Sequence, residues 1–186
     1  MGDKKIIFDT DFLSTIFLID KFELVSSLYP DHDFVIPDTV KKELFDNTYR
    51  NSPIIQSNCQ KKIDEGIIKI HDPITINDDD FLTVWSKLRT TGLRGGPSVD
   101  KGEADAITLQ QRYRCVVASN NLKDINFYSR TLKFELITFS SILFRAYKID
   151  LITKKEASST FKLLKDNDYK IGNYNSFEDF LAFMEE

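Results

Sequence analysis

The chain has 186 residues, a length that suits one domain with a substantial core. Its hydrophobic content of 41%, with 15 Phe and 7 Tyr, excludes a generally disordered chain. The formal net charge of −4 argues against a protein that coats nucleic acid non-specifically, because such proteins need a basic surface. Only two histidines are present, which disfavours a His-based zinc site or a Ser-His-Asp triad.

The N-terminal pattern and the spacing of the cysteines indicate the compartment in which we expect the protein. The sequence contains no long uncharged apolar stretch and no signal-peptide pattern at its N-terminus, so we expect no membrane contact. Cys59 and Cys115 lack CxxC spacing and are expected to be reduced thiols. These features predict a cytoplasmic protein.

Short apolar runs alternate with helical patterns along the chain. The run from Ile6 to Phe8 is typical of a strand buried on both faces, and a helix is expected to start at Asp11. The other predicted strands are Phe34–Ile36, Ile67–Ile70, Cys115–Ala118 and Phe134–Thr138. Helices are expected at residues 24–28, 40–44, 54–63, 77–88, 103–112 and 122–128. Three further helices follow, and the last of them covers residues 176–184.

Strands that alternate with helices predict an α/β fold with a parallel sheet of about five strands. We expect one domain, with a main body over residues 1–150 and a helical extension of the same domain over 151–186. In such sheets ligands bind beyond the carboxyl ends of the strands, where the strand order reverses. Acidic residues that follow the strands are therefore candidate site residues.

Asp9 is the strongest candidate because it directly follows a fully apolar strand, where solubility gives no reason for a carboxylate. Its structural alternative is to cap the next helix, a role that Asp11 could also fill. Asp124 follows the fourth predicted strand after two asparagines, and its alternative is a turn or helix cap. If the first and fourth strands are neighbours, Asp9 and Asp124 face one crevice.

Two glutamates complete the candidate set. Glu43 lies at the margin of the buried stripe of its helix, and the alternative is a solvated helix residue. Glu103 fits a capping box with Asp100, and this structural role is the alternative to a functional one. Asp105 lies about 200° around the helix from Glu103, so it is a substitute or a more distant member of the site.

Four segments in this order resemble the motifs of PIN-domain nucleases, in the prokaryotic branch with a Gly-Glu-Ala motif. They lie within residues 4–138, and they are Ile7–Ser14, Val35–Leu44, Lys101–Leu109 and Val117–Asp124. The chain departs from the family in having Asp11 where Asn is more usual. It also has Asn120 and Asn121 where some members have an acid.

The resemblance implies a three-layer α/β/α sandwich and an RNA-cleaving activity dependent on Mg²⁺ or Mn²⁺, often found in toxin–antitoxin modules. It carries catalytic roles to Asp9, Glu43, Glu103 and Asp124, and metal binding to Asp9, Glu103 and Asp124. Asp11, Asp105, Ser119 and Asn121 are candidates for supporting these ligands. Expected partners are RNA, an antitoxin protein and a second copy of the chain. Backbone binding needs cations, and Lys87, Arg89, Arg94 and Lys101 flank the Gly-rich loop over residues 92–102, while Lys123 lies by the last motif. Among these, Arg94, Lys101 and Lys123 are the candidates for binding the RNA backbone.

Two other functions remain open. Asp9-Thr10-Asp11 also matches the start of haloacid-dehalogenase-type phosphatases, with Asp9 as the nucleophile. Leu13 departs from that pattern, and no acid pair follows the fourth strand. The second alternative is a PIN-fold binding module whose catalytic site has decayed. Its last helix, with Phe177, Phe180 and Phe183, could dock to a partner.

Overall fold

The computed structural model describes residues 4–46, 52–71, 79–167 and 174–185. Five strands form one sheet in the order β3-β2-β1-β4-β5, and every neighbouring pair is parallel. Their bounds are β1 Lys4–Phe8, β2 His32–Pro37, β3 Ile68–His71, β4 Val116–Ala118 and β5 Leu136–Ile137. The predicted α/β fold with five parallel strands is confirmed, and the strand order reverses at β1.

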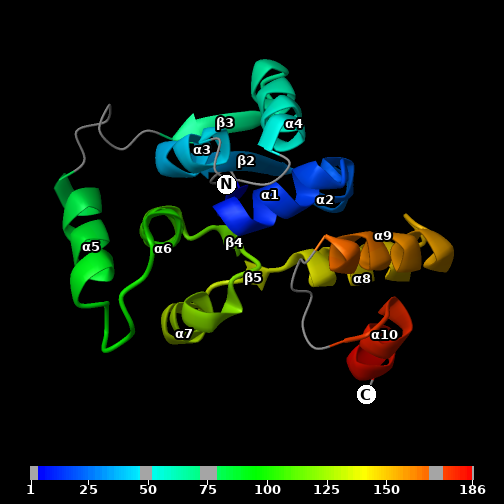
Figure 1. Ribbon diagram of the computed structural model, residues 1–186. Helices are drawn as coiled ribbons and strands as arrows, with labels where there is room; N and C mark the ends of the chain where they lie inside the picture. The colour runs from blue at the N-terminus through cyan, green and yellow to red at the C-terminus, as the bar shows by residue number, and fades with distance from the viewer. Residues whose placement is uncertain (1–3, 47–51, 72–78, 168–173, 186) are drawn as a thin grey trace.

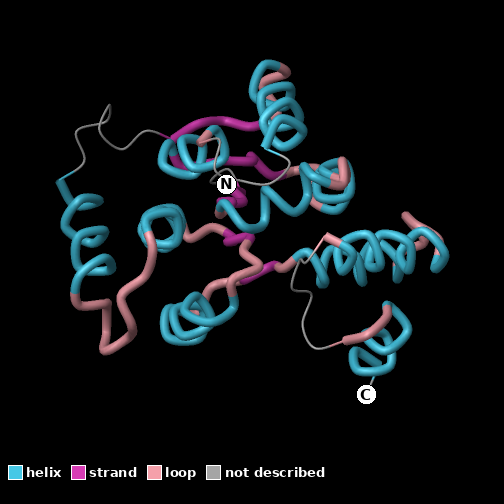
Figure 2. Tube along the Cα trace, in the orientation of Figure 1, coloured by secondary structure: helices cyan, strands magenta, loops and turns pink. Residues whose placement is uncertain are grey.

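Helices lie on both sides of this sheet and make a three-layer α/β/α sandwich (Figure 1). Figure 2 shows the strands crossing between the two helical layers. The helices are α1 Thr10–Leu18, α2 Phe22–Leu28, α3 Asp38–Phe45, α4 Ser52–Asp64, α5 Asp79–Thr90, α6 Lys101–Tyr113, α7 Leu122–Leu132, α8 Phe139–Lys148, α9 Lys154–Asp166 and α10 Phe177–Glu185. The predicted start of α5 at Asn77 lies outside the described residues.

Alternation along the strands divides the core in two. Ile6 and Phe8 of β1 point to one side, where α1, α2, α8, α9 and α10 pack, whereas Ile7 points to the other side, toward α6 and α7. Both faces of the central strand are therefore buried, which explains why its sequence is continuously apolar. The first cluster also contains Phe161 and Phe177 of the C-terminal helices. The division at residue 150 stays a prediction.

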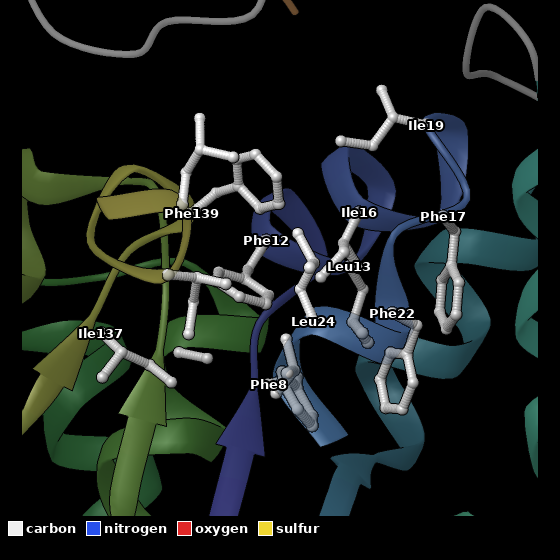
Figure 3. Close-up of a cluster of buried hydrophobic side chains, with 14 of the residues drawn as sticks. Phe8, Phe12, Leu13, Ile16, Phe17, Ile19, Phe22, Leu24, Ile137 and Phe139 are labelled. Atoms are coloured by element: carbon white, nitrogen blue, oxygen red, sulfur yellow. The ribbon is translucent and has the colours of Figure 1, made fainter. Parts of the chain in front are cut away.

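Aromatic side chains fill the space between β1 and the helices above it (Figure 3). The Phe8 ring is fully buried, with its centroid 5.6 Å from that of Phe12, 5.9 Å from that of Phe22 and 5.9 Å from that of Phe34. These tilted ring contacts add to the free energy gained by burial. This cluster fixes β1, and with it the residue that follows the strand.

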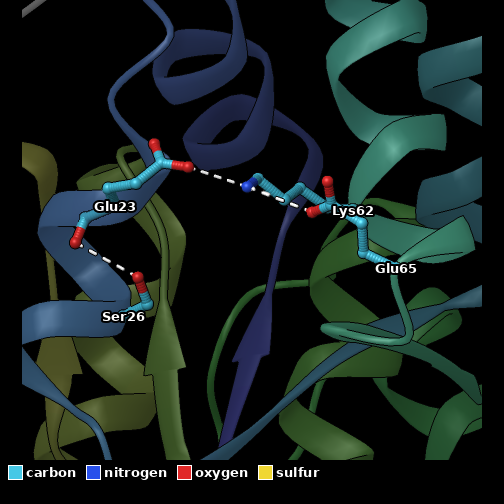
Figure 4. A network of polar contacts seen from close by, with 4 residues as sticks. All are labelled: Glu23, Ser26, Lys62 and Glu65. Carbon is cyan, nitrogen blue, oxygen red and sulfur yellow. Dashed lines mark hydrogen bonds and ion pairs between the residues drawn. The ribbon is translucent and has the colours of Figure 1, made fainter.

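On the surface, Lys62 of α4 joins α2. Its Nζ atom lies 2.7 Å from Oε1 of Glu23 and 3.3 Å from Oε2 of Glu65, and Ser26 Oγ donates to the Glu23 carbonyl (Figure 4). Pairs of this exposed kind contribute little to stability. In the part of the chain that the structure describes, no helix has both the length and the apolar character needed to cross a bilayer.

The aromatic cluster predicts unequal costs for two Phe→Ala substitutions. Phe8→Ala should lower the free energy of unfolding by about 3–5 kcal/mol, because it leaves a cavity at the centre of the core. Phe183→Ala should lower it by about 1 kcal/mol or less, because that side chain is 58% exposed. Urea denaturation measures both values, and similar losses in the two variants would contradict this account of the core.

Candidate active site

A pocket of about 370 Å³ opens at the carboxyl edge of the sheet, beside the end of β1. Residues from β1–α1, α3, α5, the α5–α6 loop, α6 and the β4–α7 loop come together here. The lining residues are Asp9, Thr10, Asp11, Glu43, Arg89, Asp100, Lys101, Gly102, Glu103 and Asn121. Three of the four predicted catalytic acids therefore share one pocket, and Asp9 and Glu43 do not open onto separate surfaces.

Asp9 follows β1 and is 3% exposed. It is itself the N-cap of α1, because its Oδ1 accepts the Phe12 N–H at 2.8 Å. The expectation that Asp11 could take over the cap is wrong, since Asp11 already lies in the first turn of the helix. Burial raises the pKa of Asp9 from its ordinary 3.8 to about 8, although hydrogen bonds from Ser119 and Phe12 lower it. The charges of Asp11 and Glu103 raise it further.

Glu103 lies in the first turn of α6, and hydrogen bonds hold both of its carboxylate oxygens. Oε1 accepts from Asn121 Nδ2 at 2.8 Å, and Oε2 accepts from the Asp100 N–H at 3.2 Å. The capping contact predicted from sequence is thus present, and the same carboxylate also lines the pocket. Burial, followed by the charges of Asp124, Asp100 and Asp11, raises the pKa of Glu103 to about 7, although the Asp100 N–H lowers it.

Glu43 reaches the pocket from α3 and accepts a hydrogen bond at Oε2 from the Thr10 hydroxyl. Gly102 of α6 lies against both groups. A Cβ atom added there would lie 3.4 Å from Glu43 Oε2 and 3.4 Å from Thr10 Oγ1. These distances correspond to van der Waals contact, so α6 packs directly against the Thr10–Glu43 pair at this residue. Sequence reasoning did not single out Thr10, although its place next to Asp9 was a usable signal.

Asp105 faces a different direction from Glu103. It is 2% exposed, and it accepts a hydrogen bond from the Thr39 hydroxyl of α3. Burial raises the pKa of Asp105 to about 6, the Thr39 hydrogen bond lowers it, and the charge of Glu43 raises it. Asp105 thus joins α6, which carries Glu103, to α3, which carries Glu43, and it does not line the pocket.

Polar residues in the segment after β4 cap α7 and connect neighbouring helices. Ser119 is fully buried, and its Oγ accepts from the Asn121 N–H, while Asn121 caps α7. Asn120 Nδ2 donates to Thr15, and its Oδ1 accepts from the Phe139 N–H, so this amide joins α1 to α8. Asp124 is half-buried in the first turn of α7 and does not line the pocket, but its charge reaches Glu103. Asn121, not Asp124, is thus the N-cap of α7.

Two cations line the pocket, Lys101 and Arg89, and both belong to the cations that flank the Gly-rich loop in the sequence. Lys101 lies at its edge in the first turn of α6. Arg89 reaches it from the last turn of α5. Arg94 and Lys123 are exposed and do not line it.

The donor set suits a hard divalent cation, because carboxylate and amide oxygens are the ligands such ions prefer. Asp9 and Glu103 are buried acids with raised pKa values, which a nearby cation would lower. Among the described residues, no group of three or more His, Cys, Asp or Glu side chains forms an evident metal site. Internal donors hold oxygens of Asp9, Glu43 and Glu103 instead, so ligation would need some of these hydrogen bonds to exchange.

Comparisons with known proteins leave the family of this chain open. No family model and no curated protein matches the sequence. A solved structure of FitAB bound to an IR36 DNA fragment is similar, with a TM-score of 0.46 and 12% identity. The match covers 72% of this chain and 94% of the other. Because this similarity is low, it assigns no function, and the function has to follow from the pocket.

The raised pKa values predict a loss of stability with rising pH when no metal is present. Asp9 and Glu103 hold protons more tightly in the folded than in the unfolded chain, so the stability they contribute is present below about pH 4 and is lost toward about pH 8. Chemical denaturation in EDTA should give a lower free energy of unfolding at pH 8.5 than at pH 5. Asp9→Asn should remove more than about 1 kcal/mol of this difference, because Asn keeps the cap but does not ionise.

The exposed Asp31 supplies the matched control. Asp31→Asn makes the same chemical change outside the pocket and should leave the pH dependence as in the wild type. An unchanged pH dependence in Asp9→Asn would show that this carboxyl group does not cause it.

Proposed function

We propose that the pocket is the active centre of a ribonuclease of the PIN-domain type that depends on Mg²⁺ or Mn²⁺. One observation carries the proposal: Asp9, Glu43 and Glu103, from three distant segments, line one pocket at the carboxyl edge of a parallel sheet. Ligands of parallel α/β sheets bind at this edge. The motif resemblance supports the same activity and adds RNA as the substrate.

Asp9 and Glu103 would hold the metal ion, and Asp124 would add negative charge close to Glu103. When bound, the ion supplies Lewis-acid activation of water and neutralises charge on the phosphodiester. The carboxylates supply the negative charge that attracts it. Asn121 and the Asp100 N–H orient Glu103, and the Phe12 N–H orients Asp9.

Glu43 is assigned the proton-accepting role. The Thr10 hydroxyl donates to its Oε2, and the carboxylate lines the same pocket as Asp9. A carboxylate positioned in this way can take a proton from the water that attacks the phosphorus atom. An antitoxin partner and self-association stay predictions from the family resemblance.

The two alternatives make different demands on the pocket. A phosphatase mechanism needs Asp9 as a nucleophile, but its Oδ1 accepts the Phe12 N–H and the side chain is almost fully buried. A binding module needs no metal. Trapping of a phosphoryl group on Asp9 would support the phosphatase, and intact RNA without stabilisation by Mn²⁺ would support the binding module.

Metal binding should stabilise the fold. Mn²⁺ at about 100 times its dissociation constant is expected to add about 2.7 kcal/mol to the free energy of unfolding, because it binds the assembled pocket and not the unfolded chain. Thermal denaturation with and without Mn²⁺ measures this as a rise in melting temperature. The rise should be much smaller in Asp9→Asn and unchanged in Asp31→Asn.

The purified protein should cleave single-stranded RNA only when Mg²⁺ or Mn²⁺ is present. Asp9→Asn and Glu103→Gln should each lower the cleavage rate by at least about 100-fold, because they remove charged ligands. Asn121→Ala should lower it by about 10- to 100-fold, since it frees Glu103 from one hydrogen bond. Gel analysis of a labelled RNA gives the rates.

Asp31→Asn is again the control and should cleave at the wild-type rate, with melting curves to verify that every variant folds. Cleavage that continues in EDTA, or an active and folded Asp9→Asn protein, would refute the proposed mechanism.

A further inference from the structure

We infer that Arg89 binds a phosphate of the RNA strand at the mouth of the pocket; this inference rests on the proposed function. Five carboxylates line the pocket, those of Asp9, Asp11, Glu43, Asp100 and Glu103. Those of them that are ionised repel a polyanion. The lining contains two cations, Arg89 and Lys101, and they are the groups there that can attract the RNA backbone.

Arg89 is held in place before any ligand arrives. Its Nη1 donates to the Val99 carbonyl at 2.7 Å, and the Val99 N–H donates to the Leu88 carbonyl at 3.1 Å. Leu88 and Val99 are both buried in the core cluster below the pocket. The end of α5 and the segment before α6 thus hold each other, and the guanidinium has little freedom left to lose on binding.

The same guanidinium keeps donors for a ligand. Within the described part of the chain, its polar contacts use Nη1, while Nε and Nη2 are available for a phosphate. Asp100 Oδ1 lies 3.6 Å from Nη1, and the Asp100 side chain is 96% exposed, so solvent screens this pair. A phosphate can replace Asp100 as the counter-ion and form the paired hydrogen bonds that arginine makes with oxyanions.

Lys101 lacks both the fixed position and the planar set of donors that Arg89 has. It is exposed at the start of α6, and its ammonium is a flexible point charge. We therefore assign the defined phosphate contact to Arg89 and a general attraction to Lys101. In this arrangement Arg89 sets the position of the RNA strand relative to Asp9 and Glu103, which line the same pocket.

The test measures RNA binding separately from cleavage. In an Asp9→Asn background with Mg²⁺, fluorescence anisotropy gives the dissociation constant of a labelled single-stranded RNA at several KCl concentrations. Arg89→Met should weaken binding roughly tenfold and reduce the slope of log K against log [KCl] by about 0.7, the value for one lost phosphate contact. Arg89→Lys should keep the slope, because the charge remains, but bind less tightly.

Arg130 provides the matched control, because it is an exposed arginine in the last turn of α7, at the end of the helix away from Asn121. Arg130→Met makes the same change in net charge and should leave both the dissociation constant and the slope unaltered. The series is repeated with wild-type Asp9 in EDTA, which keeps the RNA intact without the background substitution. Melting temperatures identify variants that fail to fold.

An unaltered slope in Arg89→Met, or an equal loss in Arg130→Met, would overturn the assignment of Arg89. If the chain with Asp9 intact still cleaves RNA in that case, the proposed function stands without this contact. If the chain with Asp9 intact neither binds nor cleaves RNA, the proposed ribonuclease function is refuted, independently of the result with Arg89→Met.

Discussion

Between the central strands β1 and β4, the Asp9 N–H donates to the carbonyl of Ala118 at 3.0 Å. This bond continues the parallel pairing of Phe8 with Ala118 by one residue beyond the strand. It fixes the relative positions at which the segments after β1 and after β4 leave the sheet. Asp9 therefore starts α1 level with the Ser119 turn, and Asn121 can reach Glu103 from the β4 side. The rest of the pocket is arranged around this one register.

Burial of carboxylates works against the stability of the fold that contains them. Asp9 and Glu103 lie in surroundings that disfavour their charge, and each receives hydrogen bonds that offset part of that cost. The same donors fix the direction of the carboxylates. Under the proposed function, these carboxylates would cost stability in the absence of a cation and would be oriented for ligation in its presence, which is a common compromise between stability and activity.

The pocket combines acidic and basic side chains. The buried acids lie at the end of β1 and in the first turn of α6, whereas Arg89 comes from the end of α5 and the exposed Lys101 from the start of α6. Nucleic acid and a divalent cation require opposite signs of charge, and the pocket offers both within one volume.

Local sequence determined the fold because burial of a strand on both faces requires a run such as Ile6–Phe8, and helices that follow such runs imply parallel pairing. It also indicated Asp9, since a residue that follows a parallel strand lies at the ligand-binding edge of the sheet. Glu43 and Glu103 were indicated by their places in helices and by the motif resemblance. The tertiary structure alone decided the place of Asp124 outside the pocket, the contact of Asp105 with Thr39 and the entry of Arg89. These depend on how α3, α5 and α7 rotate and pack against α6, and that packing is set by contacts between residues far apart in the chain.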